Sequence, residues 1–233
     1  MPLIRVLEAE VMDTAAAACE YDAMDHAQVN RAFVADLIAV WNQTLISPLS
    51  DTSDAPPVDV LDLGTGTALI PIELCEQLAH CRVMAGDAST AMLDLAVYNI
   101  ASACLSARIQ LTQLDAKKLE YADAYFDLVM SNSIIHHIPE PLCVLREALR
   151  VTKPGGLLFF RDLLRPHGAA ELAALVETHA ADANDHQRRM FAESLHAALT
   201  LAEIRDLVTS LGFPAETVTA TSDRHWTWAA QKV

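Results

Sequence analysis

Two glycines form a tight turn directly after an apolar run, in the segment Gly64-Thr65-Gly66. Glycine lets the backbone approach a ligand closely and adopt positive φ angles, so the amides of this turn can bind a nucleotide-like ligand. The dinucleotide fingerprint G-x-G-x-x-G/A requires glycine or alanine at position 69, where the chain has Leu69. The spacing therefore argues against pyrophosphate binding, while a plain turn without a ligand stays open.

Carboxylates end three of the apolar runs. Asp62 precedes the glycine turn, and Asp87 ends the next run. A carboxylate in the position of Asp87 can accept both hydroxyls of a ribose, a feature that NAD and adenosyl ligands share. Asp115, followed by Ala116, ends the third run and can lie beside an adenine amino group, although a surface carboxylate fits equally well. These acids indicate a nucleoside ligand without choosing its class.

A fourth run ends at Asn132, shortly before the pair His136-His137. An imidazole can act as a general base near neutral pH, and His137 is the preferred candidate over His136. A structural role for both at the start of the next helix stays open. Further along, Arg161 can bind a carboxylate or phosphate of a substrate, or it can pair with Asp162.

Tyr21 and His26 lie in a polar stretch of an otherwise helical region. They are candidates to close over a ligand and contact a substrate, and a solvated helix face is the alternative. Other histidines, at positions 179, 186 and 196, lack the spacing of metal ligands, so no metal site is expected.

These candidates need a scaffold that gathers them at one edge. Strands predicted from apolar runs alternate with helices predicted from helical periodicity, which indicates a parallel sheet covered on both faces. The strands are expected at 58–63, 81–86, 108–114, 126–132 and 157–161, and the helices at 70–79, 90–102 and 141–151. Ligands of such sheets bind beyond the carboxyl ends of the strands, where the acids, Asn132 and the histidines follow.

The flanking segments differ from this alternation. Residues 1–50 have helical spacing of apolar side chains, and a Ser- and Pro-rich linker follows. Residues 165–199 form an Ala-rich helical insertion after the fifth strand, of the kind that often acts as a lid. A capping box from Thr200 to Glu203 starts another helix, and strands at 216–221 and 225–231 are expected to form an antiparallel hairpin.

Composition narrows the class of partner. The chain has 233 residues, of which 52 % are hydrophobic, and a net charge of −15, which disfavours nucleic-acid partners. The five cysteines form no C-x-x-C pair, as expected of reduced thiols in a cytoplasmic protein. Neither a secretory signal nor a run long enough to span a membrane is recognisable, so no membrane partner is expected. The oligomeric state stays open.

Taken together, the motifs resemble the class I S-adenosylmethionine-dependent methyltransferases. The resemblance covers residues 56–162 and extends to the reversed last strand at 225–231. It is carried by Val60-Leu61-Asp62-Leu63-Gly64-Thr65-Gly66-Thr67, Ala85-Gly86-Asp87-Ala88-Ser89-Thr90-Ala91-Met92-Leu93, Asp115-Ala116, Tyr125-Phe126-Asp127-Leu128-Val129-Met130-Ser131-Asn132, His136-His137-Ile138 and Leu149-Arg150-Val151-Thr152-Lys153-Pro154-Gly155-Gly156.

The resemblance implies a Rossmann-like α/β fold with a seven-stranded, mostly parallel sheet and an antiparallel last strand. It implies methyl transfer from S-adenosylmethionine, with S-adenosylhomocysteine as product. It also implies a contact for each part of the cofactor. Gly64, Thr65 and Gly66 would line the methionine and ribose part, Asp62 would bind the ammonium, and Asp87 would bind the ribose. Ala88, Met92, Asp115 and Ala116 would border the adenine, and Asn132 would lie near the sulfonium. The core would span 56–233, with 1–50 packing over the cofactor site.

Two departures from the family pattern bear on the function. Ala68 stands where the family has its third glycine, which puts cofactor binding in mild doubt. Enzymes that methylate amino groups of bases carry an N/D-P-P-Y/F tetrad, and the chain has Asn132-Ser133-Ile134-Ile135 instead. A small-molecule acceptor is therefore expected. The alternatives are a non-catalytic cofactor-binding or scaffold protein of the same fold and, more weakly, an NAD-linked oxidoreductase.

Overall fold

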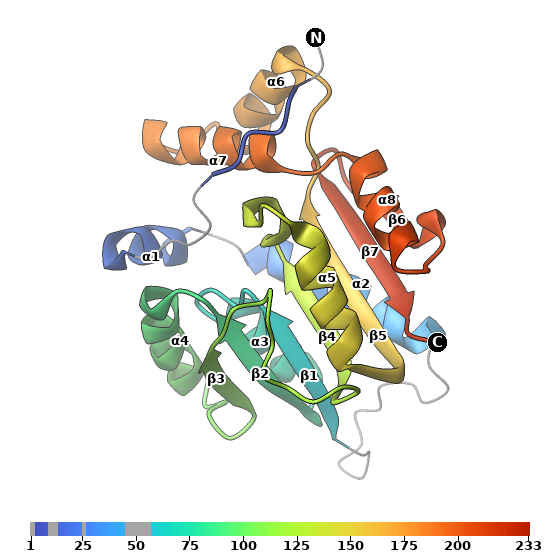
Figure 1. Ribbon diagram of the computed structural model, residues 1–233. Helices are drawn as coiled ribbons and strands as arrows, with labels where there is room; N and C mark the ends of the chain where they lie inside the picture. Colours follow the sequence, from blue (N-terminus) through green and yellow to red (C-terminus); the bar gives the residue numbers. More distant parts are fainter. Residues whose placement is uncertain (1–2, 9–13, 25–26, 45–56) are drawn as a thin grey trace.

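The computed structural model describes residues 3–8, 14–24, 27–44 and 57–233. Its centre is one seven-stranded sheet with the order β3-β2-β1-β4-β5-β7-β6 (Figure 1). The strands are β1 (Val58–Leu63), β2 (Cys81–Asp87), β3 (Ile109–Gln113), β4 (Phe126–Asn132), β5 (Thr152–Leu163), β6 (Val218–Ala220) and β7 (His225–Gln231). β1 to β5 are parallel, whereas β7 runs antiparallel to both of its neighbours. The expected fold class is confirmed.

Helices cover both faces of the sheet, as its alternating side chains require. Val60 and Phe159 belong to the core under α2 (Ala27–Thr44), α3 (Leu69–Gln77) and α4 (Thr90–Ser102). Their chain neighbours Leu61 and Phe160 belong to a second core, under α5 (Pro141–Val151) and α8 (Leu201–Ser210). Helix α2 therefore packs within the same core as the sheet, although it precedes β1 in the chain.

The helix starts follow from local sequence chemistry. The Ser89 side chain accepts a hydrogen bond from the amide of Met92 and caps α4, and Pro141 occupies the first turn of α5. The predicted capping box of Thr200 and Glu203 starts α8.

One strand begins earlier than the sequence predicts. Strand β5 begins at Thr152 and not at the predicted residue 157, because Thr152 already pairs with Phe126 of β4. The register then shifts, and Leu128 pairs with Leu157, so the glycine-rich turn becomes an irregularity within the strand.

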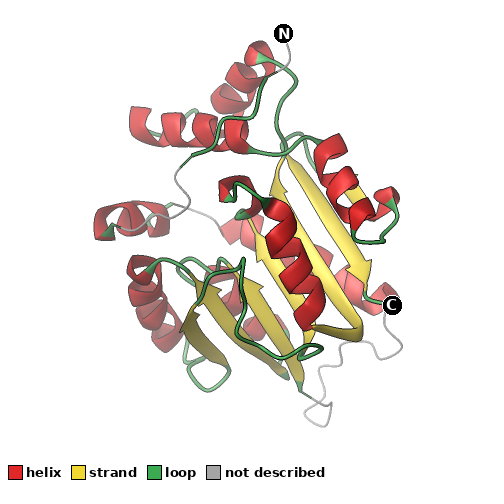
Figure 2. Cartoon of the chain, in the orientation of Figure 1, coloured by secondary structure: helices red, strands yellow, loops and turns green. Residues whose placement is uncertain are grey.

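The remaining helices extend beyond the carboxyl end of the sheet. Helices α6 (Ala169–His179) and α7 (Asp185–Ala197) share a small apolar core with the end of β5 and lie above the strand ends, next to the N-terminal segment (Figures 1 and 2). Helix α1 (Ala15–Asp22) packs near α4. Two 3-10 turns, η1 (Ile135–His137) and η2 (Ala215–Thr217), complete the described elements.

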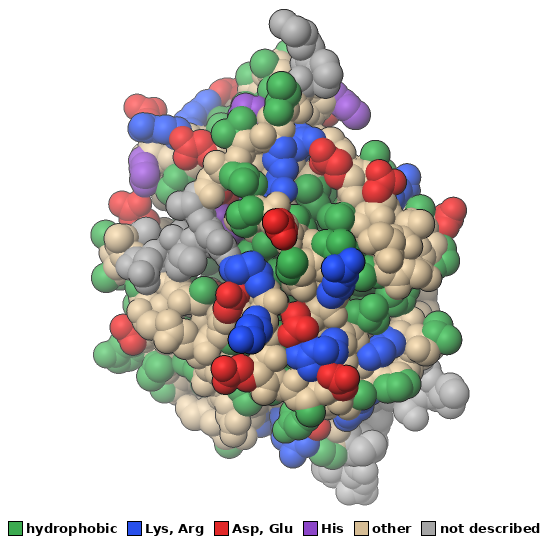
Figure 3. Space-filling view, in the orientation of Figure 1, with side chains coloured by type: hydrophobic (Ala, Val, Ile, Leu, Met, Phe, Trp, Pro, Cys, Tyr) green, Lys and Arg blue, Asp and Glu red, His purple; other side chains and the backbone are tan. Residues whose placement is uncertain are grey.

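The surface shown in Figure 3 mixes both signs of charge. Around the end of α5, Arg150 pairs with Asp123 and Glu147, and Lys153 pairs with Asp127. Basic side chains on this face are therefore interspersed with acidic ones. Within the described residues, every helix is too short or too polar to cross a lipid bilayer.

Candidate active site

A cavity of about 1010 Å³ opens beyond the carboxyl ends of β1, β2 and β4, which is the edge at which open α/β sheets bind ligands. It collects most of the residues singled out from the sequence. The predicted residues that line it are Tyr21, Gly64, Gly66, Asp87, Ala88, Met92, Asp115, Ala116, Asn132, His136 and His137. Asp62 and Thr65 line a small adjoining hollow, which shares Tyr21, Gly64 and Asn132 with the cavity.

The two glycines of the turn differ in how closely their neighbours approach the backbone. Gly64 and Gly66 have φ angles of +73° and +54°. A Cβ atom on Gly64 would lie 1.9 Å from Cγ2 of Ile134, whereas one on Gly66 would meet, among the described residues, only Tyr21, at 3.8 Å. Gly64 is therefore required by packing, and Gly66 leaves open space on the cavity side. Ala68 follows in the left-handed region at φ 65° and is fully buried, so its methyl group fits behind the turn.

Asp87 joins this turn to the end of β2. Its Oδ2 accepts a hydrogen bond from the amide of Gly66 at 2.8 Å, and its Oδ1 accepts one from the amide of Ser89 at 2.9 Å. Burial raises the pKa of Asp87, although these amide hydrogen bonds oppose the rise. The carboxylate keeps lone pairs for further donors, since each oxygen can accept two hydrogen bonds.

Asp62 is a buried carboxylate, 2 % exposed. Burial raises its pKa to about 7; the Thr65 hydroxyl opposes this rise and the charge of Asp87 adds to it. Among the described residues, none of the groups that shift the pKa of Asp62 is a cation. A ligand that brings a positive charge to this hollow would be stabilised by both carboxylates.

Asp115 also lines the cavity, and its side chain is more exposed than that of Asp62. Its Oδ1 accepts hydrogen bonds from the backbone amide of Lys117 and contacts the ammonium of the same residue, each at 2.9 Å. Partial burial acts to raise the pKa of Asp115, but these contacts with Lys117 outweigh it and lower the pKa. Ala116 and the buried Met92 supply apolar surface beside it.

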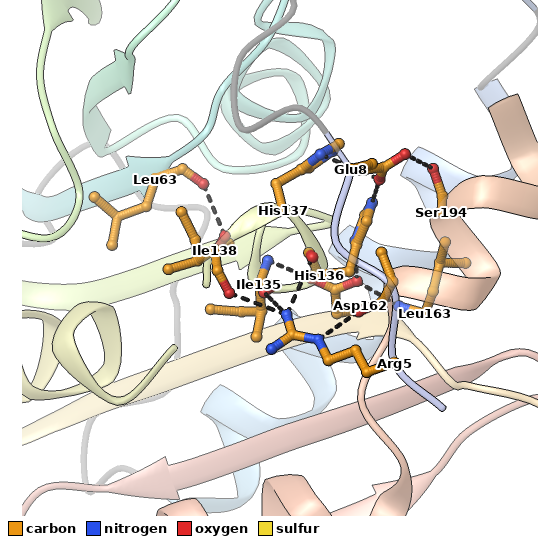
Figure 4. A network of polar contacts seen from close by, with 12 residues as sticks. Arg5, Glu8, Leu63, Ile135, His136, His137, Ile138, Asp162, Leu163 and Ser194 are labelled. Carbon is orange, nitrogen blue, oxygen red and sulfur yellow. Dashed lines mark hydrogen bonds and ion pairs between the residues drawn. The ribbon is translucent and has the colours of Figure 1, made fainter. Parts of the chain in front are cut away.

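The histidine pair lies on η1, just after β4, and the two rings are stacked with centroids 4.1 Å apart. Nδ1 of His136 contacts Oδ1 of Asp162 at 2.6 Å, and its Nε2 lies 3.3 Å from Oε1 of Glu8 (Figure 4). Nδ1 of His137 lies 3.2 Å from the same Glu8 oxygen. Burial alone would lower the pKa of His136, but the Asp162 carboxylate outweighs it and raises the pKa to about 9.

Glu8 reaches the histidines from the N-terminal segment, which Arg5 holds in place. The Arg5 guanidinium donates to the carbonyls of Ala197, at 2.7 Å, and of His136 and Ile138, at 3.1 and 3.0 Å. Sequence analysis missed Arg5 and Glu8. The segment 3–8 has no regular secondary structure, so no periodicity marked either residue.

Arg161 and Asp162 point to opposite faces of β5, as neighbours in a strand must. Arg161 is buried and pairs with Asp36 at 2.6 Å, and its Nε donates to Thr227. An ion pair with Asp162 is therefore not formed, and Arg161 does not line the cavity. Asp162 instead accepts from the amides of Ile135 and His136 and thereby fixes η1. Tyr21 lines the cavity, whereas His26 lies outside the described residues.

Comparison with known proteins decides between the nucleoside ligands. Residues 61–160 match the family described as "Methyltransferase domain". Residues 61–160 thus form a methyltransferase domain of the class I, S-adenosylmethionine-dependent type. A demethylmenaquinone methyltransferase of Mycolicibacterium paratuberculosis is 29 % identical over 167 residues, or 68 % of each chain. A release factor glutamine methyltransferase of Chlorobaculum tepidum is 38 % identical over 108 residues, or 45 % of this chain and 35 % of that one.

Solved structures share the fold of this methyltransferase at low sequence identity. The plantazolicin methyltransferase BpumL, solved with S-adenosylhomocysteine, has a TM-score of 0.71 at 15 % identity and is aligned over 93 % of this chain and 89 % of its own. A SAM-dependent methyltransferase from Aquifex aeolicus has a TM-score of 0.68 at 16 % identity, over 94 % and 99 %. The chain spans between 35 % and 68 % of the length of the curated relatives named above.

The cofactor of the methyltransferase family is S-adenosylmethionine, and the residues present fit it. The buried carboxylate of Asp62 has no cationic neighbour among the groups that set its pKa, and the cofactor carries an ammonium and a sulfonium. The open space beside Gly66 would admit a ligand against the backbone. The donor set and the shape of the methyltransferase cavity are thus those that a cationic nucleoside requires.

Proposed function

We propose that the protein transfers the methyl group of S-adenosylmethionine to a small-molecule acceptor held in the cavity. One observation carries this proposal: a single cavity is lined both by Asp87, Ala88 and Met92 and by His136 and His137. Cofactor-binding residues and groups able to accept a proton therefore face a shared volume. Its size is at the upper end of the range typical for small-molecule sites.

The cofactor assignment follows the chemistry of each position. Asp62 would hold the methionine ammonium, and Asp87 would accept the ribose hydroxyls with its remaining lone pairs. Met92 and Ala88 would flank the adenine, with Asp115 and Ala116 at its edge. Gly64, Thr65 and Gly66 would border the methionine and ribose part, and Asn132, which lines both the hollow and the cavity, would lie near the sulfonium.

The mechanism requires mainly that the acceptor atom be aligned with the methyl group and that water be excluded. When bound, S-adenosylmethionine supplies a methyl group on a positively charged sulfur. The acceptor atom bonds to the methyl carbon as the carbon–sulfur bond breaks, and the electron pair of that bond stays on sulfur. A protonated acceptor must also lose its proton. His137, which is less buried than His136 and lines the cavity, would take that proton or orient the acceptor by a hydrogen bond.

Two segments would shield the reaction. Met190 and Phe191 of α7 and Ala180 and Ala183 of the α6–α7 connection line the cavity, which supports a lid function for the insertion at 165–199. Tyr21 and Asn30 line it from the N-terminal side, which supports a covering role for the segment 1–50. The apolar side chains of Met190, Phe191, Ala180 and Ala183 would exclude water from the acceptor.

A small molecule fits the surface chemistry better than nucleic acid does. The net charge of −15 opposes binding of a phosphate backbone, and basic and acidic side chains are interspersed on the face shown in Figure 3. Two relatives are named for small or carrier-bound acceptors, a demethylmenaquinone methyltransferase and a malonyl-[acyl-carrier protein] O-methyltransferase of Hahella chejuensis. The cavity of about 1010 Å³ would be compatible with a soluble metabolite as the acceptor.

The direct test combines binding with product detection. Isothermal titration should show one S-adenosylhomocysteine per chain, and cell extract incubated with the protein and methyl-labelled S-adenosylmethionine should contain one new labelled product by mass spectrometry. Binding without any labelled product across a broad metabolite panel would favour a non-catalytic cofactor-binding protein. Absence of binding at high micromolar ligand, together with a nicotinamide fluorescence response, would instead favour an NAD-linked oxidoreductase.

A further inference from the structure

Three potential metal ligands converge at the end of the cavity, although they lie far apart in the chain. They are Oε1 of Glu8, Nε2 of His136 and Nδ1 of His137, and all three atoms lie within 4.8 Å of one another. Glu8 comes from the N-terminal segment, and the histidines come from η1 (Figure 4). Two imidazoles and one carboxylate are a donor set that suits Zn²⁺ and similar transition metals better than Mg²⁺ or Ca²⁺.

The spacings of the Glu8 oxygen from the two histidine nitrogens match those within a tetrahedral coordination shell. The Glu8 oxygen lies 3.3 Å from the His136 nitrogen and 3.2 Å from the His137 nitrogen. In a tetrahedral site with metal–ligand bonds of about 2.0–2.1 Å, neighbouring ligand atoms are about 3.3 Å apart. Glu8 Oε1 is buried, and its contacts among the described residues are these two imidazoles, which would become fellow ligands instead of ion-pair partners if a cation were bound between them.

The surroundings orient each ligand. Asp162 Oδ1 contacts Nδ1 of His136 at 2.6 Å, which leaves Nε2 directed at Glu8. A carboxylate that binds the outer nitrogen of a histidine is the usual support of a metal-ligating imidazole. The second oxygen of Glu8 accepts a hydrogen bond from the Ser194 hydroxyl at 3.2 Å. Arg5 fixes the segment that carries Glu8 through carbonyls of η1 and of the end of α7.

We propose that Glu8, His136 and His137 bind one divalent transition-metal ion of the Zn²⁺ type at the end of the cavity. Three protein ligands leave at least one coordination position open, as in catalytic rather than structural zinc sites. Because both histidines line the cavity, the open position faces the volume assigned to the acceptor. The acceptor class that fits is a molecule with an anionic or ionisable oxygen near the atom to be methylated.

Only this acceptor class rests on the proposed methyl transfer; the metal site itself stands on the geometry of the three ligands. A bound ion would also change the role of the histidines. Their nitrogens would be ligands, and the ion would take over the polarisation of an acceptor oxygen, whose proton would pass to water. The metal-free alternative is an ion pair in which Glu8 holds the N-terminal segment against protonated imidazoles.

The test uses the full, untagged chain after chelator treatment and dialysis. Titration with Zn²⁺ should show one tight site per chain, and Co²⁺ should produce the visible absorption of a low-symmetry site that contains imidazole. Glu8→Gln should weaken Zn²⁺ binding at least tenfold, and Asp162→Asn should weaken it about 10- to 100-fold through the supporting hydrogen bond. His167→Ala, at an exposed histidine outside the cluster, is the matched control and should bind Zn²⁺ as the unmodified protein does.

Two results would overturn the proposal. One is the absence of a stoichiometric site for both ions, and the other is equal Zn²⁺ affinity in Glu8→Gln and the unmodified protein, which would indicate scattered surface histidines. S-Adenosylhomocysteine binding is measured on the same samples. Intact cofactor binding without a metal site would reject the metal proposal alone, and a metal site without cofactor binding would reject the proposed function alone. Circular dichroism of each variant establishes that it is folded.

Discussion

The amide of Gly66 donates a hydrogen bond to Oδ2 of Asp87 at 2.8 Å and so links the turn after β1 to the end of β2. The second carboxylate oxygen accepts from the amide of Ser89, at the start of α4. One side chain thus fixes two backbone segments that border the cavity. Its proposed contact with the ribose would use lone pairs that these amides leave available.

Asp87→Asn replaces one acceptor oxygen with a donor that faces a backbone amide. We expect S-adenosylhomocysteine binding to weaken by about 10- to 100-fold and the free energy of unfolding to fall by about 1–3 kcal/mol, because buried hydrogen-bonding groups lose their partners. Titration calorimetry and denaturant unfolding measure the two effects. The matched variant is Asp115→Asn, at a half-exposed carboxylate, which should change both quantities less. Equal losses in the two variants would contradict the assigned role of Asp87.

Gly66→Ala should separate ligand binding from folding. Within the part of the chain that the structure describes, the added Cβ would meet only Tyr21, at 3.8 Å, so the expected cost to the fold is the strain of a positive φ angle, about 1–2 kcal/mol. The methyl group would nevertheless occupy space beside the turn that the cofactor is expected to fill. We therefore expect a folded protein whose S-adenosylhomocysteine binding is weakened at least tenfold, as measured by calorimetry.

Two other glycines provide the controls for this substitution. Gly212→Ala adds a Cβ at φ +91° with no atom of the described residues within 4 Å, so it should lose stability while leaving cofactor binding unchanged. Gly64→Ala would place its Cβ 1.9 Å from Ile134 and should destabilise the fold more than either of the others. Cofactor binding by Gly66→Ala as tight as that by Gly212→Ala would show that the cofactor does not approach Gly66.

The raised pKa of Asp62 predicts a pH dependence of cofactor binding. Its folded-state pKa of about 7 lies above the ordinary value of 3.8, so ionisation destabilises the ligand-free fold as the pH rises from about 4 to 7. An ammonium bound to Asp62 favours the ionised form. Between pH 5 and 7, S-adenosylhomocysteine binding should therefore release a proton and tighten by up to about tenfold per pH unit.

Calorimetry in buffers of different ionisation enthalpy measures this proton release. Asp62→Asn is the control, because an amide at this position cannot titrate. The variant should bind S-adenosylhomocysteine more weakly above pH 7, and its affinity should lack the pH dependence assigned to Asp62. Persistence of the same proton release in Asp62→Asn would assign the titration to another group.

Arg5→Ala should release the N-terminal segment while leaving the sheet intact. The guanidinium holds residues 3–8 against the carbonyls of His136, Ile138 and Ala197, and a charged hydrogen bond is worth about 1.5–3 kcal/mol. We expect faster amide hydrogen exchange in residues 3–8 and 135–138. Arg82→Ala, which removes an exposed ion pair with Asp59, is the control and should leave this exchange unchanged. Unaltered protection in Arg5→Ala would mean that other contacts hold the segment.

Local sequence information predicted the sheet and its helices well. The runs that became β1 and β4 have the predicted bounds, and the capping box at Thr200 starts a helix as expected, because capping depends on neighbours in the chain. Strand β5 differs, since its first residue is set by pairing with Phe126 of another strand. The register between strands depends on residues far apart in the chain, so a local sequence pattern does not predict it.

The residues of the site also differ in whether local sequence could identify them. Asp62, Gly66 and Asp87 were recognisable from the sequence because each follows directly from the end of a strand, and parallel strands bring those ends together. The partners of Arg161 and of His136 were not recognisable from the sequence. Strand alternation directs Arg161 to Asp36 and directs Asp162 to His136, and both choices depend on which helix or turn covers each face.

The sequence by itself determined the fold class and the cofactor-binding edge, because hydrophobic periodicity and turn chemistry act between residues close in the chain. Only the tertiary structure decided which groups face the proposed acceptor. Glu8 meets His136 and His137 because Arg5 ties an irregular N-terminal segment to η1 and α7. The hydrogen bonds from Arg5 join a side chain to backbone carbonyls that lie more than a hundred residues away in the sequence. Their energy depends on a geometry that exists only once the sheet has formed.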